Sequence, residues 1–172
     1  MSLDSMHGLL VMELRDMYSA ETQIVKALPK LVDAAVAPTL KNALQNHLAE
    51  TEEQVLRLER AFTFLDLPSK GKRCKGMEGL LDEGAERLDE EGPGPIRDAG
   101  IIGAAQRVEH YEIAAYGTIV TYAELLGLDQ IAVDLRMSLE EEKTANDTLT
   151  ELAESEINEL ALAVGFVEEE ET

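Results

Sequence analysis

The alternation of apolar and polar side chains predicts α-helices along almost the whole chain. Between residues 3 and 37, apolar side chains recur at steps of three and four residues, which is the spacing of one face of a helix. Pro29 removes a backbone donor inside this first helix, so we expect a kink or a split there. A second helix with one apolar side is expected from Pro38 to about Leu67.

The connection that follows has a different composition. Residues 69–76 form a compact basic loop, the only cationic patch in the sequence. A shorter amphipathic helix is expected from about residue 77 to 91. The run Gly-Pro-Gly-Pro at residues 92–95 then breaks the helical pattern.

Two more long helices are expected after this break. The first spans about Ile96 to Leu126, and Gly127 provides a C-terminal stop. The second spans about Asp129 to Val164, and Gly165 is expected to end it. The acidic residues 166–172 are expected to form a disordered tail.

The order of these segments predicts an all-α fold. Two helical hairpins are joined by a connection from residue 66 to 95, which carries a short extra helix. Four long helices with one long crossover define the ferritin-like variant of the four-helix bundle. We expect a single domain over residues 1–165, because a chain of 172 residues can bury one sizeable core.

The charge of the chain limits its partners. The formal net charge is −20, from 35 acidic and 15 basic residues, and such a chain repels phosphate backbones. No apolar stretch approaches the roughly 20 residues of a membrane span. We therefore expect neither nucleic acid nor a membrane as a partner. The single cysteine, Cys74, fits a reducing cytoplasm and is expected to be an exposed, inert thiol, although its basic neighbours leave a lowered thiol pKa open.

Two carboxylates in the third long helix point to chemistry. A helix turns about 100° per residue, so Glu109 and Glu112 lie within about 60° of each other on an apolar stripe. Carboxylates are rarely buried unless they are paired or bind a cation. We therefore expect a positively charged partner beside this pair, and a metal ion is the simplest candidate.

The other three long helices add inward-facing candidates. Glu21 lies on the first helix, His47 and Glu50 on the second, and Glu142 on the fourth. Glu50 follows Glu21 by 29 residues, and Glu142 follows Glu109 by 33. From these near-equal separations we expect the four carboxylates to lie at one height in the bundle. Several anions at one level of a dry core repel strongly, and two divalent cations would neutralise four of them. Carboxylates with one imidazole suit iron or manganese.

Three runs of residues resemble a known family. These are Asp16–Glu21, His47–Glu52 and, most specifically, Val108–Gly117 with the sequence Val-Glu-His-Tyr-Glu-Ile-Ala-Ala-Tyr-Gly. They are similar to the YciE/YciF-like family of stress-associated ferritin-like proteins, and the resemblance extends from about Met12 to Asn158. It implies a ferritin-like bundle, commonly dimeric, with a di-metal centre. The matched positions are Glu21, His47, Glu50, Glu109, Glu112 and Glu142.

The sequence departs from the usual di-iron pattern. Such bundles generally supply Glu-x-x-His from two of their helices. Here the order is reversed in His47-x-x-Glu50, and Ala145 stands three residues after Glu142. The coordination is then all-carboxylate, asymmetric or lost. An occupied di-metal centre, an empty remnant and ordinary surface carboxylates all stay open as interpretations.

Some neighbouring residues have two interpretations. Tyr18 and Tyr116 each lie one turn from a candidate ligand, so either hydrogen bonding to that ligand or core packing is expected. His110 points about 100° away from Glu109 and is expected to face a neighbouring helix or a partner chain. Glu141 is expected on a solvated face.

Two classes of function follow. The first is a redox metalloprotein with two iron or manganese ions, for which ferrous oxidation, peroxide scavenging and catalase-like disproportionation are all open. The second is a structural or interaction module that forms a homodimer through an apolar outer face. Iron storage in a hollow shell is a third interpretation, which would need assembly contacts that the sequence does not reveal.

Overall fold

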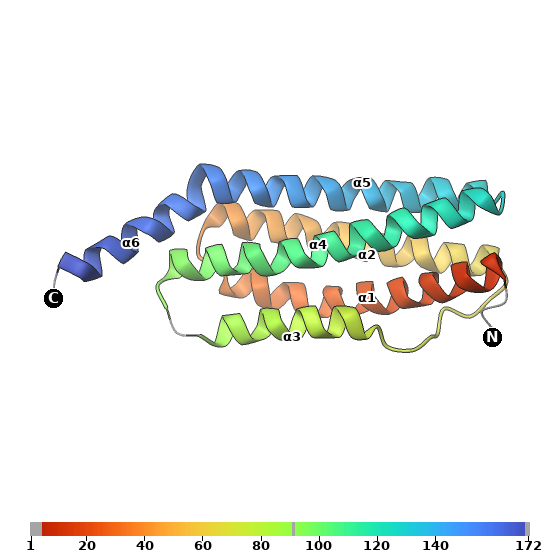
Figure 1. Cartoon of the computed structure of the whole chain (residues 1–172), viewed down its shortest axis with the longest axis horizontal. Helices are drawn as coiled ribbons and strands as arrows, with labels where there is room; N and C mark the ends of the chain where they lie inside the picture. The colour runs from red at the N-terminus through yellow and green to blue at the C-terminus, as the bar shows by residue number, and fades with distance from the viewer. Residues whose placement is uncertain (1–4, 91, 171–172) are drawn as a thin grey trace.

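A computed structural model describes the backbone of residues 5–90 and 92–170 and the side chains of residues 5–90 and 92–164. Four long helices lie side by side and a shorter helix packs beside them (Figure 1). Within the described ranges there is no strand, so the expected all-α, ferritin-like bundle with one long crossover is confirmed. The helices are α1 (Met6–Ala34), α2 (Pro38–Phe64), α3 (Lys75–Asp89), α4 (Gly94–Leu125), α5 (Asp129–Leu152) and α6 (Asn158–Glu170).

The first helix runs through its internal proline without a break. Ser5 caps the start of α1, because its hydroxyl oxygen accepts a hydrogen bond from the backbone N–H of Gly8 at 3.0 Å. Of the two outcomes expected at Pro29, the split is wrong, because α1 continues to Ala34, and the kink stays a prediction. Leu28 and Val32 are buried on either side of the proline, and their packing holds the helix together across the missing hydrogen bond.

The turn between α1 and α2 is tied to α4 by one carboxylate. Asp98 is 1% exposed and accepts hydrogen bonds from the backbone N–H groups of Val36, at 2.9 Å, and Ala37, at 2.7 Å. Both N–H groups precede α2, which begins at Pro38 as predicted. Asp98 therefore fixes one hairpin of the bundle against the other.

The fourth long helix is interrupted, which the apolar pattern did not predict. Gly127 adopts a left-handed φ of 67° between α4 and α5, as expected of a C-terminal stop. Residues Ala153–Ile157 then form a π-helical turn, η1, and the chain changes direction into α6 (Figure 1). The expected end at Gly165 is wrong, since α6 continues to Glu170. A glycine costs a helix only about 1 kcal/mol and need not end it. The disorder of the acidic tail stays a prediction, and residues 171–172 lie outside the described residues.

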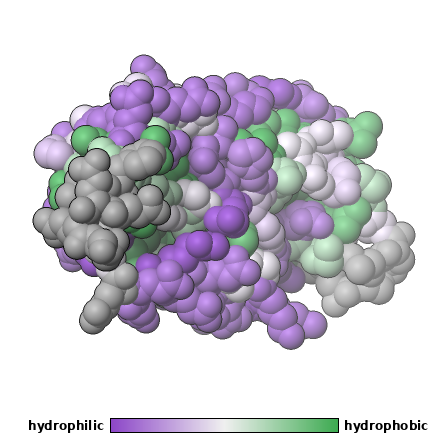
Figure 2. All heavy atoms as spheres, turned by 60° about the vertical axis from the view of Figure 1, so that its left-hand side comes forward, coloured by the Kyte–Doolittle hydropathy of each residue, from purple (hydrophilic) through white to green (hydrophobic). Residues whose placement is uncertain are grey.

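The core runs the length of the bundle. The packed helix pairs are α1 with α2, α4 with α5, α2 with α5 and α1 with α4, while α3 covers α1 and α4. Leu, Ile, Met and Ala side chains fill the core, together with Phe62 and Tyr116. The face drawn in Figure 2 is largely hydrophilic, with hydrophobic side chains in small areas. Among the described helices, none combines the length and the apolar character that crossing a membrane requires.

Candidate metal centre

Five of the six predicted ligands meet inside the bundle. Each of the four long helices contributes at least one of them, and all of them are buried. Their exposed fractions are 0% for Glu21, Glu112 and Glu142, 2% for Glu109 and 6% for His47. We call these five residues the carboxylate cluster.

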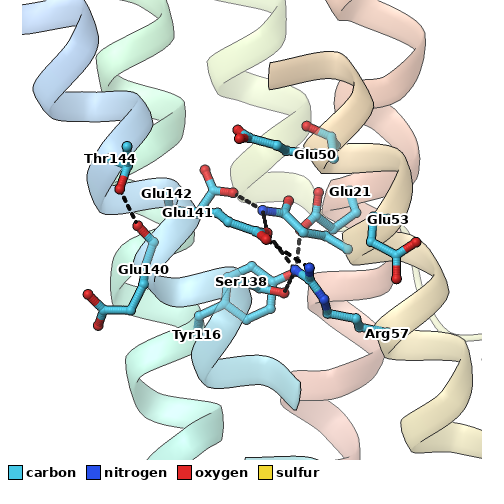
Figure 3. Close-up of polar contacts among 12 residues, drawn as sticks. Glu21, Glu50, Glu53, Arg57, Tyr116, Ser138, Glu140, Glu141, Glu142 and Thr144 are labelled. Atoms are coloured by element: carbon cyan, nitrogen blue, oxygen red, sulfur yellow. Dashed lines mark hydrogen bonds and ion pairs between the residues drawn. The ribbon is translucent and has the colours of Figure 1, made fainter. Parts of the chain in front are cut away.

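The donor atoms of the cluster are close together. The Nε2 atom of His47 lies 3.3 Å from Oε1 of Glu109 and 3.9 Å from Oε2 of Glu142. One ligand atom from each of His47, Glu109, Glu112 and Glu142 falls within 4.8 Å of the others. Glu21 reaches into the same part of the bundle from α1 (Figure 3). Of the four carboxylates expected at one height, Glu21, Glu109 and Glu142 are therefore buried in the cluster, whereas Glu50 is 46% exposed and lies outside it.

Most of these donor atoms have no hydrogen-bond partner within the described residues. They are Oε2 of Glu21, both ring nitrogens of His47, Oε2 of Glu109, both carboxylate oxygens of Glu112 and Oε2 of Glu142. Nor does any lysine or arginine of the described chain form an ion pair with a carboxylate of the cluster. Buried polar atoms are normally satisfied, and a group left without a partner is costly. Such a buried group of histidine and glutamate side chains could hold a metal ion.

The electrostatics of the cluster agree with this geometry. Burial raises the pKa of Glu21, Glu109 and Glu112 well above the ordinary value of 4.5, and neighbouring carboxylates raise it further. In the absence of a cation the cluster therefore takes up protons. A divalent cation competes with those protons for the same oxygen atoms, so its binding releases them.

Glu50 is the predicted ligand that the structure does not bring into the cluster. Its side chain is 46% exposed, and its Oε2 atom lies 3.8 Å from Nδ1 of His47. Glu50, His47 and Glu109 line a cavity of about 140 Å³, with Thr144 and Thr148 on the α5 side. Glu50 therefore lies beside the carboxylate cluster, in a cavity whose lining includes residues of α2 and α5.

A network of hydrogen-bonded side chains from α2 and α5 fixes the position of Glu142. The Nε2 atom of Gln54 donates to Oε1 of Glu142 and, at 3.1 Å, to Oε2 of Glu141. Arg57 donates to both oxygens of Glu141, with Nη2 2.7 Å from Oε1, and to the hydroxyl of Ser138 at 3.2 Å (Figure 3). The expectation that Glu141 lies on a solvated face is wrong, because it pairs with an arginine whose side chain is 7% exposed.

The two tyrosines differ in their relation to the cluster. Tyr116 is fully buried and its hydroxyl donates to Oε1 of Glu21, so it both packs in the core and orients a candidate ligand. Burial and the charge of Glu21 raise the pKa of Tyr116 well above its ordinary value, which keeps the phenol protonated. Tyr18 instead donates to Glu59 at 2.9 Å. His110 is exposed beside the backbone carbonyl of Gln106.

Sequence reasoning missed Gln54 and Arg57. Gln54 is fully buried and Arg57 is 6% exposed, although both are polar. They follow His47 by seven and ten residues, which places them about two and three turns farther along the inward side of α2. A polar residue on an otherwise apolar stripe was the signal that would have found them.

Cys74 is buried rather than exposed, so the expectation of an exposed thiol is wrong. It is 1% exposed, and its Sγ atom lies 3.0 Å from Oδ2 of Asp16 and 3.0 Å from the hydroxyl of Tyr111. Burial is the main cause that raises the pKa of the thiol. The alternative of a thiolate activated by the basic loop therefore finds no support.

Comparisons with known proteins agree with the fold. Residues 5–162 match the family described as "Domain of unknown function (DUF892)". The protein YciF of Escherichia coli (strain K12) is 40% identical over 162 residues, covering 94% of this chain and 98% of that protein. The crystal structure of this E. coli stress protein has a TM-score of 0.87, covering 91% of this chain and 99% of the other. YcfI of Rhodopseudomonas palustris is 43% identical with a TM-score of 0.83, covering 87% and 97% of the two chains.

Proposed function

The chain belongs to the DUF892 family and is a relative of the stress protein YciF, and we propose that it binds two iron or manganese ions in the carboxylate cluster for redox chemistry under oxidative stress. The observation that carries this proposal is the set of partnerless donor atoms on five buried side chains from four helices. A bundle core tolerates such a set only when protons or cations compensate its charge.

The donor set fits divalent iron or manganese. Four carboxylates carry four negative charges when ionised, which two divalent cations balance. Carboxylate oxygens with a single imidazole are the ligands that these metals favour. His47, Glu109, Glu112 and Glu142 supply the donors that lie within 4.8 Å of one another, and Glu21 adds a carboxylate from α1.

The residues around the cluster suit a small oxidant as substrate. Two bound ions would each supply one electron and would act as Lewis acids toward peroxide or oxygen, which is the chemistry that ferroxidase, peroxidase and catalase-like reactions share. The cavity beside His47 and Glu50 admits only a small molecule, at about 140 Å³. Tyr116 keeps a proton at its hydroxyl beside Glu21, and Gln54 fixes the orientation of Glu142.

Metal counting tests this proposal. The protein is stripped of metal, reconstituted anaerobically with ferrous or manganous salt and freed of excess ions, and the bound metal is measured by mass spectrometry. We expect about two ions per chain, as in other carboxylate-rich bundles. The variant Glu112→Gln should lose most of this metal, whereas Glu140→Gln, an exposed position on α5, should retain it. Fewer than about one ion per chain in the parent protein would contradict the proposal.

A structural or interaction role is the second candidate, and the relative from R. palustris is described as a structural protein. Thermal unfolding with and without a chelator separates the two. A ligand that binds only the folded state raises its stability, so a metal-built core should melt at a lower temperature after chelation. An unchanged melting temperature would favour the structural module.

A further inference from the structure

A second and larger cavity shares no lining residue with the carboxylate cluster. It measures about 1160 Å³ and lies where the segment before α3 runs beside α1 (Figure 1). Its walls come from α1, from residues 70–76, from the first turn of α3 and from Tyr111 of α4. Small-molecule sites usually measure roughly 300–1,000 Å³, so this cavity has room for a whole organic ligand.

The lining of this cavity is strongly basic in a strongly acidic protein. Five of the chain's 15 basic residues line it, against two acidic ones, which gives the lining a formal net charge of +3. The whole chain has a formal net charge of −20. The five basic residues are Arg15, Lys70, Lys72, Arg73 and Lys75.

Both acidic residues of the lining are already engaged. Asp16 accepts hydrogen bonds from the hydroxyl of Tyr111, at 2.8 Å, and from the thiol of Cys74, at 3.0 Å. Glu78 pairs with Arg73 at 2.7 Å. The other four basic side chains form no ion pair within the described residues, and the buried Nε atom of Arg15 has no hydrogen-bond partner there. These cationic groups are therefore left for a ligand.

The loop that carries the lysines is held in place. A Cβ atom on Gly71 would lie 2.7 Å from Cβ of Arg15, and one on Gly76 would lie 2.8 Å from the ring of Tyr111. Only glycine allows the loop backbone to approach α1, and the first turn of α3 to approach α4, so closely. The backbone of Cys74 is anchored as well, since its N–H donates to Ser19 at 2.8 Å and its carbonyl accepts from Gln23 at 3.2 Å.

We propose that this cavity binds an organic phosphate, a small molecule with at least two negative charges and an apolar part. The cationic side chains and the N-terminal end of α3 would hold the phosphate groups, and Met12 and the ring of Tyr111 offer apolar contact. A long nucleic acid is disfavoured because the rest of the surface repels it. A small ligand senses mainly the local charge, because screening limits electrostatic reach to about 8 Å at physiological salt. This proposal does not depend on the metal centre.

Isothermal titration calorimetry tests the site on the metal-free full-length protein at physiological salt, where the screening length is about 8 Å. The probes are ATP, pyrophosphate and the uncharged nucleoside adenosine. We expect ATP and pyrophosphate to bind and adenosine not to bind. Arg15→Gln and Lys72→Gln should each weaken ATP binding by about tenfold, the size of one lost charge-assisted contact. The matched control is Lys26→Gln, an exposed lysine on the same helix as Arg15, which should bind as the parent does.

Three results would overturn the proposal. The first is the absence of ATP and pyrophosphate binding at ligand concentrations up to about 1 mM. The second is unchanged affinity in Lys72→Gln, whose exposed side chain should not affect folding. The third is adenosine binding as tightly as ATP. None of these outcomes bears on metal binding, because no metal is present in the titration.

Discussion

At the scale of single residues, the buried carboxylates tie the stability of the metal-free protein to pH. Burial raises the pKa of Glu109 and Glu112 above the ordinary 4.5, so the folded chain holds protons that the unfolded chain releases. Their contribution to stability is fully present below about pH 4.5 and is lost as the pH rises through the higher pKa of the folded state. The same protons must leave when a metal binds, so metal affinity should rise with pH.

We therefore expect the metal-free protein to become less stable as the pH rises above the ordinary carboxyl pKa of 4.5. Glu112→Gln removes one of the titrating groups and should flatten this dependence by up to about 1.4 kcal/mol per pH unit. Urea unfolding at a series of pH values measures it, with Glu140→Gln as the control that keeps the parent slope. Stability that rises over this range, or an unchanged slope in Glu112→Gln, would count against a buried anionic cluster.

The buried side chain of Arg57 should contribute to the free energy of unfolding. Arg57→Met leaves Glu141 without its partner and loosens Gln54, which orients Glu142. We expect a loss of about 2 kcal/mol in the free energy of unfolding, below the cost of breaking a fully buried pair because Glu141 is 25% exposed. The control Arg60→Met removes a half-exposed arginine and should cost less than about 1 kcal/mol. Equal losses in urea unfolding would mean that the buried pair has no special role.

Residue positions on a helical face were predictable, but their depth was not. The angles of Glu21, Glu109 and Glu142 on their helices placed them inward, and all three are buried. Glu50 lies at the edge of its stripe, where exposure depends on how closely the neighbouring helix covers it. The helical spacing also predicted that Glu141 is solvated, because the spacing within one helix does not reveal an ion pair with an arginine on α2.

At the scale of elements, the periodic apolar pattern predicted all the long helices, and most of their ends fall near the predicted residues. Local exceptions within helices were harder to foresee. The π-helical turn Ala153–Ile157 adds a single residue to one turn and hardly changes the pattern around it. Similarly, the breaking effect of Pro29 is local, whereas the packing that overrides it comes from other helices. Cys74 lies just before α3, where no periodicity indicates burial.

Pro29 should therefore lower the free energy of unfolding without preventing the bundle from folding. It is exposed, so Pro29→Ala removes no packing and restores a backbone donor in the middle of α1. We expect the free energy of unfolding to rise by about 1–3 kcal/mol. Lys30→Ala, at the next exposed position, serves as the control and should change stability by less than about 0.5 kcal/mol. A Pro29→Ala variant that is no more stable than the parent would show that the helix is shaped around its proline.

At the scale of the whole molecule, the fold follows from the order of the helices and the length of the one crossover. That order was readable from the sequence, and the similarity to YciF extends over nearly the full chain. What the order does not determine is how the crossover packs, since residues 65–74 have no helical pattern. The expected homodimer and the absence of nucleic-acid binding both remain predictions.

The net charge of −20 should limit the stability of the metal-free bundle. Added salt shortens the screening length from about 30 Å at 0.01 M to about 3 Å at 1 M and so weakens the repulsion between acidic groups. We expect the melting temperature at neutral pH to rise with sodium chloride over this range. The effect should disappear near the isoelectric point of about 4.4, which is the internal control. A melting temperature that does not respond to salt at neutral pH would show that this repulsion is already compensated.

Metal binding at the carboxylate cluster can be seen by anomalous scattering from crystals of the reconstituted protein, measured on either side of the iron and manganese absorption edges. We expect metal peaks among His47, Glu109, Glu112 and Glu142, with Glu21 completing the ligands. A map without a peak at the carboxylate cluster, from protein saturated with both metals, would contradict it.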